Sequence, residues 1–409
     1  MKQRECRYCK APLSVSFADL GMTPLSNAYL KPEELERMEP FYPLHAWVCG
    51  KCFLVQLEQF ETPDRIFGDD YAYFSSYSDL WLDHARQYVE MMAKRFAPRF
   101  VMEIASNDGY LLQYFVQRKV PVLGVEPAAN VAAAAEKKGV PSLVKFFGTA
   151  TAQELVAAGK RPDLLVGNNV LAHVPDLHDF VEGMRVVLAP QGVITMEFPH
   201  LLRLMQENQF DTIYHEHFSY FSLLVVERVF AAHQLTIFDV EELTTHGGSL
   251  RIFARHAAHA GLPVTPRVEA LRAREKQAGL EKLATYSAFA DQVKATKRAL
   301  LRFLVEANES GKKVAAYGAP AKANTLLNYC GVRRDLLEYT VDRSPQKQGR
   351  FLPGTHIPVY APEKLRETRP DYVVVLPWNL KDEIVPQLAY VAGWGGKLVL
   401  PIPRLKVLE

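Results

Sequence analysis

The chain has 409 residues, of which 48% are hydrophobic and 23% charged, values that are ordinary for globular proteins. This composition excludes a disordered or fibrous class, and the length predicts two or three domains. The 48 lysines and arginines nearly balance the 46 aspartates and glutamates, so we expect no nucleic-acid partner.

No segment of the sequence has the pattern of an export signal or a membrane span. The N-terminus lacks the roughly 7–15 apolar residues of a signal peptide, and no run reaches about 18 apolar residues. We therefore expect a cytoplasmic protein without membrane association.

Four of the five cysteines form two C-x-x-C pairs, Cys6 with Cys9 and Cys49 with Cys52. Four thiolates suit tetrahedral zinc, whereas a redox dithiol normally uses one pair beside a βαβ unit. A catalytic zinc would keep one position for water, so four cysteines predict a closed structural site. We expect a small zinc-binding domain over residues 1–80 that needs the metal to fold. The fifth cysteine, Cys330, is expected in buried packing.

The remainder of the chain alternates helical and short apolar segments, which predicts two α/β domains, residues 81–253 and 254–409, with the first built on a doubly wound parallel sheet. Predicted strands in the first domain are 100–105, 121–125, 164–166 and 192–198. Predicted helices there are 79–95, 109–118 and 130–138. The second domain has predicted helices at 263–278 and 281–310 and predicted strands at 313–317, 337–341, 372–376 and 397–400.

The strand at 100–105 ends in a turn of small and acidic residues that precedes a helix. In open α/β sheets ligands bind at such a turn, facing the next helix N-terminus. About twenty residues later, Glu126 ends a strand where a carboxylate can accept both ribose hydroxyls of an adenosine cofactor. The turn lacks G-x-G-x-x-G spacing, and the sulfonium of S-adenosylmethionine tolerates Glu103 and Asp108 better than a pyrophosphate does. A purely structural turn is the alternative.

Several motifs, taken in order along the chain, resemble the zinc-containing sugar C-methyltransferases. They are the two cysteine pairs, Glu103–Gly109, Asn168–Val174, Tyr214–His217 and Gly247–Arg251. The resemblance covers nearly the whole chain and implies a class I methyltransferase domain followed by a second Rossmann-like domain. It also implies S-adenosylmethionine-dependent methylation of C3, beside the ketone, in a nucleotide-linked deoxy-4-ketosugar. The carrier is typically dTDP.

The resemblance further implies a set of cofactor contacts. Ala105 stands where methyltransferase loops usually have glycine, and we expect it to keep a negative φ and to alter a contact without abolishing binding. Phe146 and Phe147 are candidates to flank the adenine, with a plain core role as the alternative. The implied cofactor residues are Glu103, Ala105, Asn107, Gly109, Glu126 and Asn169.

The implied catalytic residues are Tyr214, Glu216, His217 and His173. Removing a proton beside a ketone creates an enolate, so the site needs a base and a donor aimed at the developing oxyanion. By resemblance His217 is the base, Glu216 orients or tunes it, and Tyr214 or His173 stabilises the enolate at O4. The alternative for His173 is a loop cap.

Two other histidines and one aromatic segment are more ambiguous. His215 and His246 receive no role, because a lone histidine is more often a surface or satisfied core residue. Tyr71 and Tyr77 are candidate substrate contacts that would close over the cofactor and sugar, with an interdomain core as the alternative.

In the last domain, residues 316–324 have the form of a strand, a tight turn and a helix start that carries Lys322 and Asn324. We expect the diphosphate of the sugar nucleotide at this helix N-terminus, with Asp342 near a ribose or base. A dinucleotide site is one alternative, although only Gly318 of the usual three glycines is present. A degenerate structural Rossmann unit is another.

Two rival functions remain at this stage. An O- or N-methyltransferase of another small molecule would need no enolate stabiliser, and a non-catalytic zinc-ribbon protein would bind nucleotide without turnover. The sequence leaves open the sugar, any amino group on it, the nucleotide base and the oligomeric state.

Overall fold

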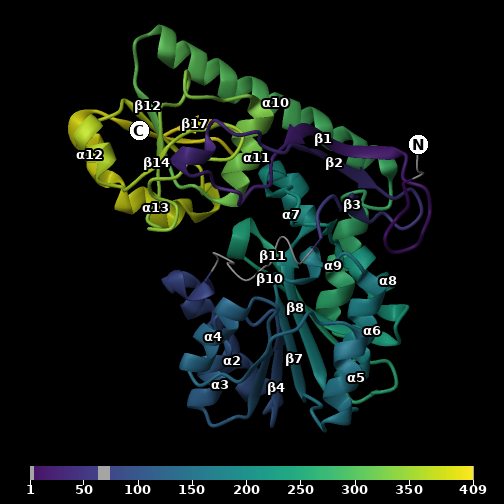
Figure 1. The fold of residues 1–409 in the computed structure, drawn as a ribbon. Helices are drawn as coiled ribbons and strands as arrows, with labels where there is room; N and C mark the ends of the chain where they lie inside the picture. Colours follow the sequence, from purple (N-terminus) through teal and green to yellow (C-terminus); the bar gives the residue numbers. More distant parts are fainter. Residues whose placement is uncertain (1–3, 63–73, 409) are drawn as a thin grey trace.

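The computed structural model describes residues 4–62 and 74–408. Within these residues the strands form three sheets, of four, seven and six strands. Figure 1 shows the seven-stranded sheet in the lower half, with the other two sheets above it and the long helix α10 (Leu283–Glu309) running along the top. The predicted α/β class is confirmed.

The N-terminal unit is an antiparallel sheet in the order β1-β2-β3-β9. Its fourth strand comes from far along the chain, because Val55 pairs with Tyr220 and Gln56 with Ser219. Phe17 of β1 stacks on Phe289 of α10, with ring centroids 4.7 Å apart. The unit therefore shares its core with the rest of the protein, and its expected dependence on the metal stays a prediction. The bounds are β1 (Val15–Thr23), β2 (Tyr42–Val48), β3 (Val55–Leu57) and β9 (Ser219–Tyr220).

The central sheet has the order β10-β11-β8-β7-β4-β5-β6. Strands β4 to β8 are parallel, and each predicted strand is present, because their apolar residues are buried on both faces. The hairpin β10–β11 adds two antiparallel strands at the β8 edge, which the sequence did not predict. The bounds are β4 (Val101–Ile104), β5 (Val122–Val125), β6 (Ser142–Leu143), β7 (Leu164–Asn168), β8 (Val193–Pro199), β10 (Leu235–Leu243) and β11 (Ser249–His256).

Helices cover this sheet, and local signals mark several of their ends. Ser78 caps α2 by accepting from the Trp81 amide, and Asp176 caps α6. The left-handed residue Ala97 ends α2. The bounds are α2 (Asp79–Phe96), α3 (Leu112–Gln117), α4 (Ala129–Lys137), α5 (Thr149–Ala157), α6 (Leu177–Val187), α7 (Leu201–Gln206) and α8 (Leu223–Ala231).

The C-terminal sheet has the order β14-β13-β12-β15-β16-β17, parallel except for β17. The four predicted strands are present, although the one at 337–341 shortens to β13, and Cys330 is buried at the end of α11 as expected. Strands are β12 (Val314–Tyr317), β13 (Thr340–Val341), β14 (Val359–Tyr360), β15 (Tyr372–Val375), β16 (Lys397–Leu400) and β17 (Lys406–Val407). Helices are α9 (Pro266–Gln277), α11 (Ala321–Cys330), α12 (Lys364–Thr368) and α13 (Lys381–Gln387), besides α10.

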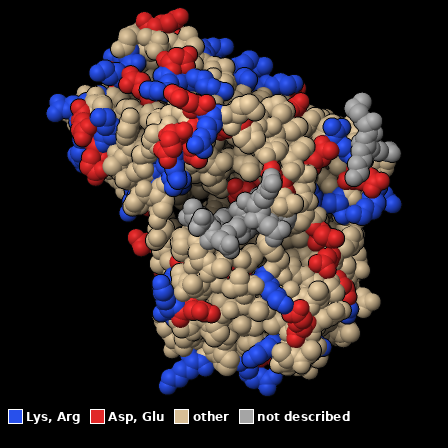
Figure 2. Space-filling model, viewed as in Figure 1, with Lys and Arg blue, Asp and Glu red and all other residues tan. Residues whose placement is uncertain are grey.

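Each parallel sheet has one point where the strand order reverses, between β4 and β7 and between β12 and β15. Ligands of open α/β sheets bind outside the carboxyl ends of strands at such points. The two points adjoin, because Asn169 after β7 bonds His246, and a Cβ on the next residue, Gly247, would lie 3.1 Å from Trp378, which follows β15. Figure 2 shows a recess between these two halves, on a face where acidic and basic side chains are interspersed.

Across the described ranges, 4–62 and 74–408, no helix combines the length and apolarity needed to cross a bilayer.

Candidate functional site

The turn after β4 has an unusual backbone conformation. Ala105, Asn107 and Gly109 all have positive φ, at 54°, 49° and 73°. The expected negative φ of Ala105 is therefore wrong: the turn imposes a conformation that strains alanine and that asparagine accepts more readily. A Cβ on Gly109 would lie 3.1 Å from Val140, so glycine is required there for both space and conformation.

Glu126, at the end of β5, braces this turn. Its carboxylate accepts from the backbone N–H of Asn107 at 2.9 Å and of Ala128 at 2.9 Å. Burial raises its pKa, and the two amide donors partly oppose that rise. Each oxygen has one amide partner, which leaves acceptor capacity for ribose hydroxyls.

Other predicted cofactor residues lie around the same turn. Glu103 is fully buried, and burial raises its pKa well above the ordinary value. Asn169 follows β7, has a φ of 53° and donates from Nδ2 to Nε2 of His246 at 3.0 Å. Both residues therefore border the reversal point between β4 and β7.

The aromatic residues predicted to contact cofactor or substrate differ in how far they are buried. Phe147 packs edge-on against Phe180 and serves the core, whereas Phe146 is 42% exposed. Tyr77 is 69% exposed, which does not fit an interdomain core, and Tyr71 lies outside the described residues. Beside Tyr77, the Ser75 amide donates to Asn107 Oδ1 at 2.8 Å, so this segment contacts the cofactor turn.

Tyr214 and His217 form a hydrogen-bonded pair. Nδ1 of His217 lies 3.0 Å from the Thr212 carbonyl, so it carries the proton, and Nε2 accepts from the Tyr214 hydroxyl at 2.8 Å. Burial, followed by nearby His173, lowers the pKa of His217 well below its ordinary value. His217 is therefore neutral at pH 7 and able to take a proton.

His173, at the end of the short helix η3 (Leu171–His173) after β7, packs edge-on against His217 with centroids 4.7 Å apart. Burial lowers its pKa to about 4, and its ring bonds the backbone of Glu216, which opposes that shift. The structure thus joins His173, Tyr214 and His217 in one cluster.

Glu216 belongs to the same segment but does not orient His217 as predicted. Both ring nitrogens of His217 bond elsewhere, and Oε1 of Glu216 accepts from Nδ2 of Asn27 at 2.7 Å. Burial raises the pKa of Glu216 to about 7. Sequence reasoning missed Asn27, because this contact joins residues 189 positions apart.

The two predicted substrate residues of α11, Lys322 and Asn324, make different kinds of contact. Nζ of Lys322 bonds Oδ1 of Asn379 at 2.9 Å and sits 4.8 Å from the Trp378 ring centroid, and burial lowers its pKa. Asn324 is buried and donates to the Ser26 carbonyl, so it fixes the N-terminal unit to α11. Lys322 is thus the better placed of the two for a ligand.

Asp342, at the end of β13, accepts from the Ala319 amide at 2.7 Å and the Ser344 amide at 2.8 Å. These bonds fix the turn that leads into α11. The same turn receives the hydroxyl of Tyr29 and Nζ of Lys347 on the Ala319 carbonyl, two contacts that sequence reasoning missed.

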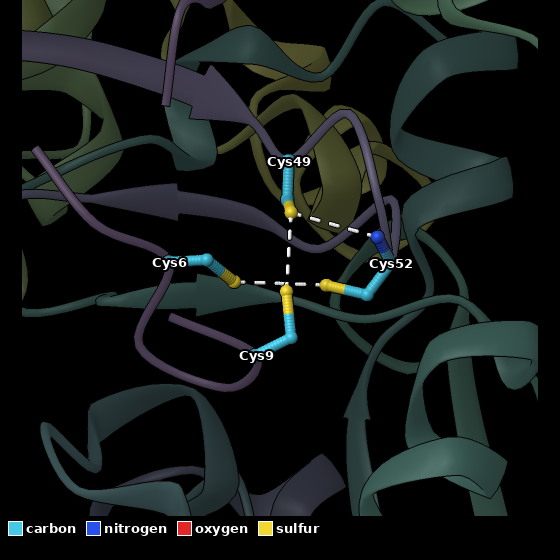
Figure 3. Close-up of side chains that lie close together, drawn as sticks. All are labelled: Cys6, Cys9, Cys49 and Cys52. Carbon is cyan, nitrogen blue, oxygen red and sulfur yellow. Dashed lines mark hydrogen bonds between the residues drawn. The ribbon is translucent and has the colours of Figure 1, made fainter. Parts of the chain in front are cut away.

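The four paired cysteines converge on one point, and Figure 3 shows their sulfurs directed toward one another. The sulfurs all lie within 4.8 Å, with Cys6 and Cys52 at 3.6 Å and Cys9 and Cys49 at 3.4 Å. Zinc–sulfur bonds of about 2.3 Å place tetrahedral sulfurs roughly 3.8 Å apart, so the cluster fits zinc. Gln56 donates to the Cys6 sulfur at 3.2 Å, a contact that stabilises a thiolate ligand.

Known proteins match this architecture along the whole chain. A zinc binding domain matches residues 6–67, a methyltransferase domain 81–240 and a C-methyltransferase C-terminal domain 244–403. The chain is 36% identical over 411 residues to the C-methyltransferase NovU of Streptomyces niveus, covering 99% of this chain and 97% of that protein.

Solved methyltransferase structures are also similar to part of the chain. CcbJ methyltransferase from Streptomyces caelestis is 14% identical, with a TM-score of 0.34 over 42% of this chain and 90% of that one. Magnesium protoporphyrin IX methyltransferase of Synechocystis PCC 6803 is 15% identical, with a TM-score of 0.33 over 47% and 88%.

The domains and the cysteine centre define an S-adenosylmethionine-dependent methyltransferase that binds zinc. The chain belongs to the family of zinc-containing C-methyltransferases that includes NovU. The predicted enzyme class, cofactor and metal are therefore confirmed.

The zinc centre leads to a first prediction. Cys49→Ser should lower zinc content from about one ion per chain and reduce soluble yield, because breaking the tetrahedron removes folding free energy. Cys330→Ala, at the cysteine outside the centre, should keep its zinc. Metal analysis of the purified proteins checks this, and a folded, fully active metal-free enzyme would contradict it.

Glu126 leads to a second prediction. Glu126→Ala should weaken S-adenosylmethionine binding about 10–100-fold, because charge-assisted hydrogen bonds of roughly 1.5–3 kcal/mol are lost and the turn loosens. Calorimetric titration measures the affinity, with Glu136→Ala on the exposed face of α4 as the control. Unchanged affinity in Glu126→Ala would remove this carboxylate from the cofactor site.

Proposed function

We propose that this C-methyltransferase adds a methyl group to C3 of a nucleotide-linked 4-keto-deoxysugar, carried by dTDP, through an enolate. One observation carries the proposal: a neutral, hydrogen-bonded Tyr214–His217 pair lies beside His173 where the two sheet-reversal points adjoin. Methylation of oxygen or nitrogen needs no enolate stabiliser, because those acceptors attack the methyl group through a lone pair that they already hold. Carbon beside a ketone must first lose a proton.

His217 takes the C3 proton in this proposal. Its Nε2 lone pair faces the Tyr214 hydroxyl, so the proton reaches Nε2 either directly, after the sugar displaces that hydroxyl, or through it. The Thr212 carbonyl holds Nδ1–H in both cases and stabilises the imidazolium that forms. S-adenosylmethionine supplies the methyl group, and the residues after β4 and β5 would hold it: Ala105, Asn107, Gly109 and Glu126.

Lys322 at the N-terminus of α11 would bind the diphosphate. This ten-residue helix begins at the reversal point of the C-terminal sheet, and its positive end favours an anion. Tyr71 and Tyr77 would cover the sugar. We further infer that the boundaries fall near residues 80 and 253, and that the enzyme works in the cytoplasm, where thiolate ligands stay reduced.

His217→Asn should abolish both methylation and exchange of the C3 hydrogen of the ketosugar in deuterated water with S-adenosylhomocysteine. A general base contributes roughly 10²–10⁴-fold to rate and little to ground-state binding, so cofactor affinity should remain. Mass spectrometry of a panel of nucleotide 4-ketosugars follows exchange and methyl addition.

The matched control is His215→Asn, two residues away, where the ring bonds the Pro43 carbonyl and should leave exchange intact. Tyr214→Phe should slow exchange and methylation together. Near wild-type methylation by His217→Asn would place the base elsewhere, with His173 next. A product with an O-methyl or N-methyl group would refute the carbon assignment.

A further inference from the structure

His246 occupies a constrained position at the carboxyl edge of the central sheet. It lies in the short turn η5 (Thr245–Gly247) between β10 and β11, with φ 53° and ψ 22°. Because Ser249 pairs with Pro199, this turn stands beside the carboxyl end of β8. A non-glycine residue in this conformation is uncommon and is retained where surrounding contacts determine it.

The contacts that hold this turn come from several elements of the fold. Nε2 of His246 accepts from Asn169, and the ring meets Trp81 edge-on with centroids 5.0 Å apart. The Thr245 hydroxyl donates to buried Glu197 at 2.8 Å. On the other flank, a Cβ on Gly247 would lie 3.1 Å from the Trp378 ring, which belongs to the C-terminal unit. The imidazole therefore lies beside Asn169 and Trp81, and the residue after it meets the C-terminal unit.

Its protonation state follows from these contacts. Since Nε2 accepts, the proton of the neutral ring is on Nδ1, and among the described residues this N–H has no hydrogen-bond partner. Burial, followed by the charges of Lys322 and His84, lowers the pKa of His246 to about 4, although Glu197 opposes this shift. At neutral pH His246 is an uncharged ring with one unused donor.

The other candidate donors to an enolate are already engaged. The Tyr214 hydroxyl donates to His217, and the ring of His173 bonds the backbone of Glu216. His246 bonds Asn169, which belongs to the same segment after β7 as His173, and the ring of His173 packs against His217. The unused N–H of His246 is therefore the donor best suited to an oxyanion formed beside His217.

We propose that His246 is a further catalytic residue, whose Nδ1–H donates to the ketone oxygen of the substrate and stabilises the enolate. The proposal rests on the proposed function. As the C3–H bond breaks, the proton goes to His217 and the electron pair moves onto the ketone oxygen, which accepts the hydrogen bond without taking the proton. That pair then forms the C3–CH3 bond, and the methyl donor leaves as a neutral thioether. A neutral imidazole can polarise a carbonyl in this way without transferring its proton.

Two substitutions separate this role from a purely structural one. In His246→Asn the side-chain amide occupies the position of Nδ1 and keeps a donor there, but the contact with Asn169 is lost. In His246→Gln the amide occupies the position of Nε2, so its oxygen can still accept from Asn169, but the Nδ1 donor is lost. His256→Gln, at the opposite end of β11, is the matched control.

We expect His246→Gln to lower kcat about 10²–10³-fold and to slow C3 exchange in parallel, because one oxyanion donor contributes about that much. His246→Asn should retain more activity, and all three variants should bind S-adenosylmethionine within a few-fold of wild type. The reverse order, with Gln active and Asn inactive, would show that His246 acts only by holding Asn169 and would overturn the proposal.

Nitrogen-15 NMR of histidine-labelled enzyme tests the same assignment without substrate. The His246 signal, identified by its loss in His246→Gln, should show a neutral ring protonated on Nδ1 at pH 7. A ring protonated on Nε2, or a charged ring, would overturn the proposal. If wild-type enzyme methylates only acceptors that cannot enolise, the proposed function falls and this assignment with it. Normal turnover by His246→Gln on a ketosugar overturns this assignment alone.

Discussion

Burial of uncharged imidazoles at the junction of two α/β units is the constraint on which the site depends. His173, His217 and His246 each have a pKa lowered chiefly by burial, so all three remain neutral. A base that must accept a proton and a donor that must not lose one both require this state. Water admitted to the junction would weaken the arrangement, because solvation favours the charged imidazolium.

The ionisable groups around these histidines respond to burial in two ways. Burial shifts the pKa of Lys322 and of Asp211 toward the neutral form, to about 6 for Asp211, and the opposite charge of the other group opposes each shift. On the other side of the cofactor turn, fully buried Glu197 pairs with Arg251 at 2.8 Å and accepts from His84 at 2.9 Å. Although burial opposes it, these partners lower the pKa of Glu197 to about 2, so a fixed ion pair underlies the neutral site.

The sequence predicted those parts of the fold and site that depend on neighbours in the chain. The turn after β4, Glu126 at the end of β5 and the cysteine pairs each follow from a local pattern of residue types. The hairpin β10–β11 escaped prediction because both faces of β11 are buried, Arg251 included, which hides the alternation of a half-exposed strand.

Contacts between distant segments could not be predicted from local patterns. Asn27 reaches Glu216 and Asn324 reaches Ser26 only because the loop after β1 passes between the two α/β units. The positive φ of Ala105 likewise follows from the packing of its turn, since alanine alone prefers a negative φ. The sequence assigned His246 no role, because the feature that distinguishes it is the hydrogen bond that its Nε2 accepts from distant Asn169.

The zinc centre bears on catalysis through the backbone, although it lies outside the cleft. Gln56 bonds the sulfur of Cys6, and the strand that carries it, β3, pairs with Ser219 and Tyr220 of β9. The Leu57 amide extends this pairing to the Phe218 carbonyl, the residue directly after His217. Because a strand register fixes the direction of each side chain, the metal holds the sheet that sets where His217 emerges. In this architecture zinc would serve the proposed chemistry by fixing the backbone that presents His217, the proposed base.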